Sequence, residues 1–267
     1  MSASSDPPST VSAQRRLLLF GKIPFAGRAK TRLVPALGEE GAARLYQAFL
    51  DDAVAAWGCV GGASLELWLE PREAEDPETP GRDGRIAPAR TERELRSRYP
   101  DVRLRWQAGE ELGSRLRGAF DKAFREGAGR VVAVGSDHPT LPTVYLHQAF
   151  RTLERCGLVL GPSRDGGYYA LGLRLASWPM AAELFRGIPW STPRVLQATR
   201  ERASGLGLRW EELPAWYDVD EPADLERLRR EVRAGTHTSA VLERLAGPGI
   251  GGRKKRARSP APVRDET

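Results

Sequence analysis

A chain of 267 residues, 40% hydrophobic and 28% charged, is long enough to bury a sizeable core and has the composition of a globular protein. Its run of four strongly apolar residues at 17–20 is far too short for a membrane span, and residues 1–16 lack a hydrophobic signal region, so we expect a cytoplasmic protein. The net charge of +6 is concentrated in residues 247–267, which hold six basic and two acidic side chains, and this excludes a strongly basic folded body.

Short apolar runs alternate with stretches of helical periodicity between two polar ends. The expected strands lie at 17–20, 65–69, around 104–106, 131–134, 158–160 and 169–173. The expected helices lie at 39–57, around 95, at 110–125, 143–154, near 181, near 196 and at 222–233. Residues 71–89, rich in Pro, Glu and Arg, read as an exposed connection. The alternation predicts a single Rossmann-like α/β domain with a mostly parallel sheet and helices on both faces.

Both ends of the chain are expected to be disordered tails. Residues 1–14 are rich in Ser and Pro, and residues 247–267 combine Gly and Pro with basic side chains, so neither can bury enough apolar surface to order itself. The folded domain is therefore placed at residues 15–246. Non-specific attraction of nucleic acid to the basic tail is the less favoured interpretation, and we do not expect nucleic acid to be the partner.

The loop at 21–32 follows the first strand and combines bare backbone with positive charge. Gly21 and Gly27 allow the backbone to approach an anion. The loop also supplies four positive charges, about the number needed to compensate the negative charge of a diphosphate, from Lys22, Arg28, Lys30 and Arg32. The spacing is not that of a Walker loop, because five residues separate the glycines and Pro24 removes an amide donor. A solvated basic loop is the alternative, and we favour a diphosphate site of another kind.

Two further loops carry carboxylates that could bind a metal ion. Asp137 follows the buried strand at 131–134, where an aspartate can hold Mg²⁺ or Mn²⁺, although an Asp so close to Pro139 can also form a turn or a helix cap. In the sequence DVDEP, Asp218 and Asp220 lie on the same side of the chain if it is extended, so either could supply a second metal carboxylate. A role as helix N-cap explains Asp220 almost as well. His138 is interpreted as structural.

The loop at 165–168 is a candidate substrate shelf. Gly166 and Gly167 lie between Asp165 and Tyr168, so that a base or sugar ring could rest on the backbone while the carboxylate binds hydroxyl groups. A plain hairpin turn fits the Asp-Gly pair equally well. Ligands of open α/β sheets bind beyond the carboxyl ends of the strands, where three of these four loops are expected.

Five segments together resemble a known family. These are KIPFAGRAKTRL, GSDHPTLP, GPSRDGGYYALGL, PWST after Ile188, and DVDEPADL. They are similar to the bacterial DUF2064 family, whose members are also labelled radical-SAM/selenodomain-associated transferases and, in some cases, arsenosugar-biosynthesis glycosyltransferases. The likeness runs from about residue 17 to about 230. It implies the nucleotide-diphospho-sugar transferase fold, a Rossmann-like sheet of the GT-A type.

The resemblance also implies roles for individual residues. Lys30 and Arg32 match the basic residues of nucleotidyltransferase loops that hold the phosphates, Asp137 takes the place of the metal-binding aspartate, and Asp220 that of a second ligand. Many GT-A glycosyltransferases carry Asp-x-Asp at the metal position, whereas here Gly135 and Ser136 precede a single aspartate. The Asp-x-Pro form is closer to guanylyl- and cytidylyltransferases, including those that act on molybdopterin or phospholactate.

We therefore expect a transferase that uses Mg²⁺ or Mn²⁺ and passes a glycosyl group from a nucleotide-activated sugar to a small acceptor. Arg32 and Asp220 are the expected catalytic residues, Arg32 because it stabilises the leaving diphosphate and Asp220 because it could act as a base. The first alternative is a nucleotidyltransferase, in which a phosphorylated small molecule attacks an NTP and pyrophosphate leaves. The second is a non-catalytic protein that binds nucleic acid through its basic tail.

Overall fold

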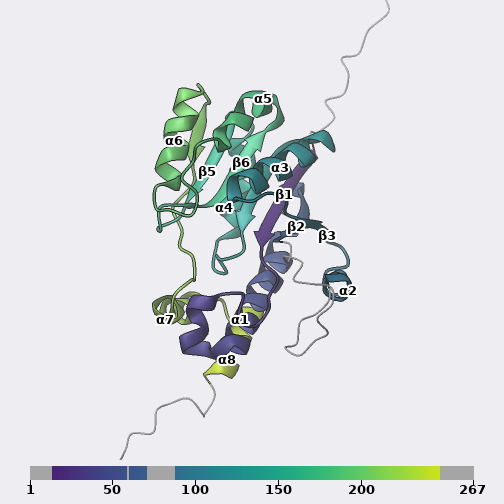
Figure 1. The fold of residues 1–267 in the computed structure, drawn as a ribbon, viewed down its shortest axis with the longest axis vertical. Coiled ribbons are helices and arrows are strands. Elements are labelled where there is room, and N and C mark those ends of the chain that lie inside the picture. Colours follow the sequence, from purple (N-terminus) through teal and green to yellow (C-terminus); the bar gives the residue numbers. More distant parts are fainter. Residues whose placement is uncertain (1–13, 59, 71–87, 247–267) are drawn as a thin grey trace, which may run out of the picture.

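The computed structural model describes residues 14–58, 60–70 and 88–246, and every structural statement below concerns those residues (Figure 1). The expectations for both tails, and for most of the connection at 71–89, lie outside them. None of the described helices is long and apolar enough to cross a membrane.

Seven strands form one mixed sheet in the order β3-β2-β1-β4-β6-β5-β7. The strands are β1 (Gln14–Gly21), β2 (Ser64–Leu69), β3 (Arg103–Trp106), β4 (Ala128–Gly135), β5 (Leu158–Pro162), β6 (Tyr168–Arg174) and β7 (Trp210–Glu212). Only β6 runs antiparallel to its neighbours β4 and β5, and the remaining pairs are parallel. The prediction of a mostly parallel Rossmann-like sheet is confirmed.

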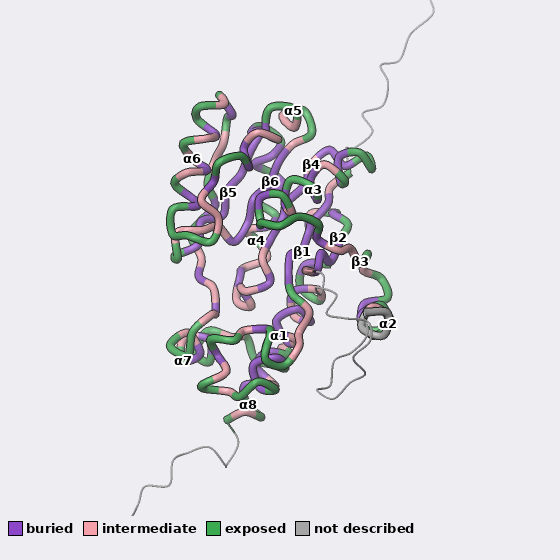
Figure 2. The backbone as a smooth tube through the Cα atoms, in the orientation of Figure 1, coloured by how far each residue is buried: buried purple, intermediate pink, exposed green. Residues whose placement is uncertain are grey.

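The helices cover both faces of this sheet, as expected. They are α1 (Val34–Trp57), α2 (Pro88–Arg98), α3 (Leu112–Arg125), α4 (Thr143–Thr152), α5 (Trp178–Ala181), α6 (Val195–Gly205), α7 (Pro222–Glu231) and α8 (His237–Leu245). Successive residues of β1 point to opposite sides, so Leu17 joins a core with α1 and α4, while Leu18 joins a core with α3 and α6. Figure 2 shows the central strands as buried between these layers.

Two helices differ from the sequence expectation. α1 begins at Val34, before residue 39, because one turn precedes a break at Gly38, whose φ of 69° and ψ of 166° are not helical. α8 was not expected at all. Its first turn is held by Asp52 of α1, which accepts hydrogen bonds from the backbone N–H groups of His237 and Thr238, both at 2.8 Å. α8 therefore packs against α1.

A buried ion pair joins neighbouring strands at the amino end of the sheet. Arg16 on β1 is 5% exposed and donates to Glu66 on β2, which is 2% exposed, at 3.0 Å. The same guanidinium donates to Glu126 at 2.6 Å. Glu66 also accepts from the indole N–H of Trp68 at 3.2 Å. Because both charges are removed from water, each requires oppositely charged partners, and within the described residues the Arg16–Glu66 pair is the one in which both side chains are buried.

Replacing Glu66 with Ala should destabilise the protein by about 3 kcal/mol, because the buried guanidinium of Arg16 loses its buried partner. Urea unfolding followed by circular dichroism measures this loss. Glu226→Ala is the matched control, since Glu226 and Arg230 form a pair whose side chains are 79% and 68% exposed, and its cost should stay below about 1 kcal/mol. Equal losses in the two variants would contradict the interpretation.

Candidate functional site

The carboxyl ends of the central strands are tied together where the predicted loops begin. The backbone N–H of Ser136 donates to the carbonyl of Phe20 at 3.0 Å, which joins the end of β4 to the end of β1. The buried side chain of Gln107, just past β3, donates to the carbonyls of Gly21 at 3.0 Å and Trp68 at 2.9 Å. The loops that follow β1, β3 and β4 therefore leave the sheet from one fixed edge.

The side chain of Tyr46 on α1 connects two of these loops, the one after β1 and the one after β4. Its buried hydroxyl accepts a hydrogen bond from the backbone N–H of Lys22 at 2.7 Å and forms a second hydrogen bond with Oγ of Ser136 at 2.7 Å. Burial, followed by the nearby Asp137 charge, raises the pKa of Tyr46, so it remains a neutral phenol. Gly21 leaves little room for a side chain here, because a Cβ would lie 3.0 Å from the tyrosine oxygen, closer than most Cβ contacts.

Lys30 is the buried cation of the first loop. Its side chain is only 4% exposed, and Nζ lies 2.6 Å from Oδ1 of Asp137 and 2.5 Å from Oδ1 of Asp220. The ammonium also lies 5.9 Å from the centre of the Tyr46 ring. We call Lys30, Asp137 and Asp220 the ion triad. Segments that follow β1, β4 and β7 meet in it.

The charges of the triad stabilise one another. Burial alone would lower the pKa of Lys30, but the carboxylates of Asp137 and Asp220 outweigh it and raise that pKa. Burial likewise opposes ionisation of Asp220, yet the Lys30 charge lowers its pKa. Burial and a hydrogen bond with Asp220 raise the pKa of the neighbouring Asp218 to about 6. One acid of this pair therefore stays ionised, while the other titrates near neutrality.

Backbone contacts hold the loop at 217–220 against the loop after β4. Val219 donates its N–H to the carbonyl of Asp137 at 3.0 Å. The ring of His138 lies with Nδ1 2.9 Å from the carbonyl of Tyr217, and since a carbonyl can only accept, Nδ1 carries the proton. Burial lowers the pKa of His138, which keeps the ring neutral. His138 thus fixes the position of two loops.

The predicted substrate loop lies beside the acidic loop. Residues 163–167 form the hairpin between β5 and β6, and Asp165 accepts the N–H of Gly167 at 2.9 Å within it. Ser163 Oγ donates to Asp218 at 3.5 Å, which links the two loops. Gly166 has a φ of 91°, and a Cβ there would lie 2.1 Å from the carbonyl of Pro193. Tyr168 packs against the core formed with α3 and α6.

The other predicted phosphate-binding residues lie on the outer side of the first loop. Lys22, Gly27 and Arg28 are exposed. Arg32 has 70% of its side chain exposed and lies 3.7 Å from Glu221, the residue that caps α7. The structure therefore brings Lys30 together with Asp137 and Asp220, and leaves the remaining cations of the loop facing solvent around them.

The triad offers carboxylate oxygens to a common cation. No set of three or more His, Cys, Asp or Glu side chains among residues 14–58, 60–70 and 88–246 is arranged to hold a metal ion. Asp137 and Asp220 are nevertheless 43% and 39% exposed and already share one cation, the ammonium of Lys30. Mg²⁺ characteristically takes one or two protein carboxylates and completes its shell with water and phosphate oxygens, so this donor set fits it.

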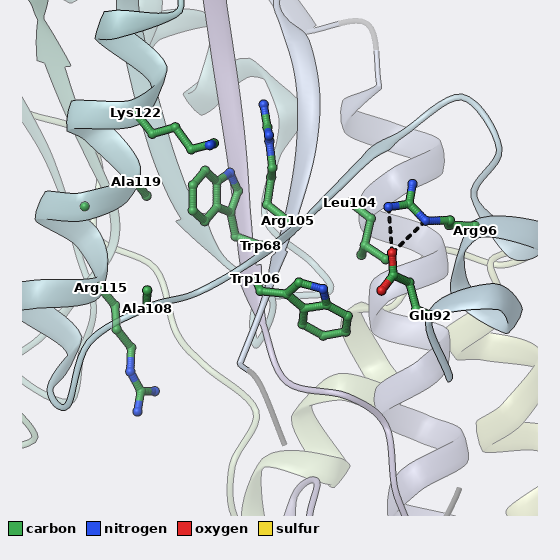
Figure 3. A pocket seen from close by; sticks show the side chains of 11 residues that line it. Trp68, Glu92, Arg96, Leu104, Arg105, Trp106, Ala108, Arg115, Ala119 and Lys122 are labelled. Carbon is green, nitrogen blue, oxygen red and sulfur yellow. Dashed lines mark hydrogen bonds and ion pairs between the residues drawn. The ribbon is translucent and has the colours of Figure 1, made fainter. Parts of the chain in front are cut away.

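A cavity of about 450 Å³ lies elsewhere, at the edge strand β3 (Figure 3). Trp68, Trp106 and Arg115 are among its lining residues. Arg115 is paired with Glu70, and Arg96 with Glu92, so these charges are compensated within the protein. None of the residues predicted from the sequence for the site lines this cavity.

Three features of the site were not predicted. Tyr46 lies within the helix expected at 39–57, and its spacing there gives no sign of its hydroxyl contacts. The sequence gives a weak sign that Gln107 belongs to the site, because it is a polar residue directly after an expected strand. Trp190 belongs to the PWST segment, to which the family resemblance assigns no role, and its ring lies 6.5 Å from that of Tyr168, edge to face.

Comparisons with known proteins identify relatives of the chain. The family described as "Uncharacterized protein conserved in bacteria (DUF2064)" matches residues 62–192. A crystal structure from Desulfovibrio desulfuricans G20, described as a "putative nucleotide-diphospho-sugar transferase", is 31% identical, has a TM-score of 0.75, and aligns over 86% of this chain and 94% of its own. No curated protein matches the sequence.

Two more distant structures share the fold alone. A 4-diphosphocytidyl-2C-methyl-D-erythritol synthase is 10% identical with a TM-score of 0.53, over 84% of this chain and 100% of its own. A cytidylyltransferase from Leptospira borgpetersenii is 12% identical with a TM-score of 0.51, over 80% of this chain and 84% of its own.

Replacing Tyr46 with Phe should lower the free energy of unfolding by about 1–3 kcal/mol, because the buried N–H of Lys22 and the hydroxyl of Ser136 lose their partner. Denaturant unfolding gives the value. Tyr145→Phe is the control, since the Tyr145 hydroxyl has no hydrogen bond within the described residues, and it should change stability by less than about 0.5 kcal/mol. An unchanged Tyr46→Phe protein would show that the two loops do not depend on this hydroxyl.

Proposed function

This chain belongs to the DUF2064 family, within the nucleotide-diphospho-sugar transferase superfamily, and from that premise we propose that it transfers a glycosyl group from a nucleotide-activated sugar to a small acceptor. The observation that carries the proposal is the ion triad, because it places a buried cation and two carboxylates at the ends of the strands, where ligands of open α/β sheets bind. The relative from Desulfovibrio supports the choice of a nucleotide-sugar donor.

In this proposal the first loop binds the diphosphate of the donor. Gly27 is exposed and admits the phosphate oxygens to the backbone, whereas Gly21 is buried against Tyr46 and Ser136 and shapes the start of the loop. The side chains of Lys22, Arg28, Lys30 and Arg32 compensate the negative charge. Lys30 and Arg32 act during the reaction as well, since negative charge grows on the leaving nucleoside diphosphate as the glycosyl bond breaks. Asp137 and Asp220 would hold Mg²⁺ or Mn²⁺, which would supply Lewis-acid stabilisation of the same charge.

The acceptor side of the site is assigned to the loop at 165–168 and to the acids beside it. Asp165 and the backbone of Gly166 and Gly167 position the sugar or the acceptor. If the reaction inverts the configuration of the sugar, a base must take the acceptor proton. Asp220 and Asp218 are the two candidates from the sequence, and we now favour Asp218, because its pKa of about 6 lies near the working range of a base while Asp220 is engaged by Lys30.

A nucleotidyltransferase is the second candidate, and one observation favours it. The metal position has a single aspartate after β4, and its partner comes from the distant loop before α7, in place of two aspartates from one Asp-x-Asp segment. In that reaction an oxygen of a phosphorylated small molecule attacks the α-phosphorus of an NTP, and the bond to the departing pyrophosphate breaks. The same loop cations would then serve the pyrophosphate.

Thermal-shift measurements should identify the donor. We expect one or a few of the UDP-, GDP-, CDP- and dTDP-sugars to raise the melting temperature more with Mn²⁺ or Mg²⁺ than without, because a ligand that binds only the folded state stabilises it by mass action. The NTPs serve as the competing set. Incubating the hit with candidate acceptors then separates the two reactions, since glycosyl transfer releases a nucleoside diphosphate and nucleotidyl transfer releases pyrophosphate. Absence of any metal-dependent nucleotide shift would defeat both proposals.

Asp137→Asn should reduce kcat roughly a hundredfold or more, since an amide replaces a charge at the metal position while the shape is kept. Steady-state kinetics with the identified donor measures the effect. Glu226→Gln removes the same charge from an exposed site on α7 and should leave kcat unchanged. If both variants retain full activity, the triad is not the reaction centre.

A further inference from the structure

The ammonium of Lys30 occupies the space between the two carboxylates that would hold a metal ion. We propose that Lys30 is a built-in counter-ion that keeps free divalent cations away from Asp137 and Asp220, and that a bound nucleotide releases it by offering its phosphates. The inference rests on the proposed function for the identity of the phosphate ligand. Its core, the exclusion of free metal by Lys30, can be tested without any nucleotide.

The hydrogen-bond geometry of the Lys30 ammonium supports this role, because its N–H groups are directed at the two carboxylates. An ammonium has three N–H groups, and two of them are directed at oxygens 2.6 and 2.5 Å away. The Tyr46 ring lies near the same nitrogen, 5.9 Å from its centre. Lys30 thus has its principal donors engaged on the two oxygens that a metal ion would need.

Burial distinguishes Lys30 from the other cations of its loop. Its side chain is 4% exposed, whereas Asp137 and Asp220 are 43% and 39% exposed. The carboxylates can therefore be reached from solvent while the ammonium lies behind them. Arg32, two residues later, is 70% exposed and pairs with Glu221 at 3.7 Å. Among the loop cations whose pairing is described, Lys30 is the one held inside the acidic site.

The backbone holds Lys30 in this position. Its φ of 51° and ψ of 46° are left-handed, a conformation that a non-glycine residue adopts at a cost. The neighbours fix it, because Ala29 is 1% exposed, Leu33 is fully buried, and the N–H of Leu33 donates to the Lys30 carbonyl at 2.8 Å. A lysine held at a strained backbone position is directed at the carboxylates by the fold itself.

Electrostatics then links metal entry to nucleotide binding. Asp137, Asp220 and Lys30 together carry a formal charge of about −1, so the ammonium removes much of the attraction for a divalent cation and would repel it at short range. Phosphate oxygens give that ammonium an alternative partner. Each ligand should therefore strengthen binding of the other by the same factor, as linkage requires.

The test compares binding of free Mn²⁺ to the wild-type protein and to Lys30→Met, measured without nucleotide by the loss of the Mn²⁺ electron paramagnetic resonance signal. We expect Lys30→Met to bind Mn²⁺ roughly tenfold more tightly or better, because a neutral side chain no longer competes for the carboxylates. The double variant Lys30→Met with Asp137→Asn should lose this gain. Equal or weaker binding by Lys30→Met would overturn the proposal.

Arg44→Met is the matched control. It removes the same charge from α1, at a side chain that is 69% exposed and lies 4.0 Å from Glu40, so the affinity for Mn²⁺ should remain within about twofold of wild type. A similar gain in Arg44→Met and Lys30→Met would mean that net charge alone is responsible, and that outcome also overturns the proposal.

A second readout covers the possibility that Lys30→Met folds poorly. Its two carboxylates face each other without a cation, so we expect a lower melting temperature that Mn²⁺ raises by more than it does in wild type. The wild-type protein alone tests the second part, because UDP, GDP, CDP or dTDP should tighten its Mn²⁺ binding. A nucleotide that binds without doing so overturns release by phosphate. If no nucleotide binds, the proposed function fails, while the comparison without nucleotide still decides the role of Lys30.

Discussion

A lysine ammonium that is almost fully removed from water needs negative partners, and this requirement organises the whole site. Lys30 obtains them from two different segments, the end of β4 and the loop before α7. The contacts from Val219 to Asp137 and from His138 to Tyr217 keep those segments together. Charges held in fixed positions need little reorganisation when a reaction develops charge nearby, which is why this arrangement suits a transferase.

The sheet supplies the rigidity beneath the triad. Gln107 and Tyr46 have no charge, yet they fix where the first loop leaves β1 and where the loop after β4 begins. The acids above them differ in protonation, with Asp220 ionised beside Lys30 and Asp218 titrating at a pKa of about 6. A neutral scaffold of hydrogen bonds thus supports a charged surface, and the two parts can be altered separately.

Most of the fold could be predicted from the sequence, because buried strands and amphipathic helices leave periodic patterns. The antiparallel direction of β6 was left open, because the Asp165-Gly166 pair fits a hairpin turn as well as a substrate loop, and the structure has the hairpin. α8 was missed because its first turn depends on Asp52, which lies far away in the chain. The loops were found through their glycines and charges. The pairing of Lys30 with both carboxylates arises only from tertiary contacts, and Tyr46 resembles any other aromatic residue on a helix face.

The pairing of Lys30 with Asp220 spans 190 residues of sequence. A ribosome that adds about 5–20 residues per second places the aspartate roughly 10–40 s after the lysine, so a growing chain holds the cation long before its second anion exists. During synthesis the triad is incomplete, because Asp137 is the one of its two acids that is present before residue 220 is added. Completion of the charged centre therefore waits for Asp220, and chains that stop before it cannot reproduce it.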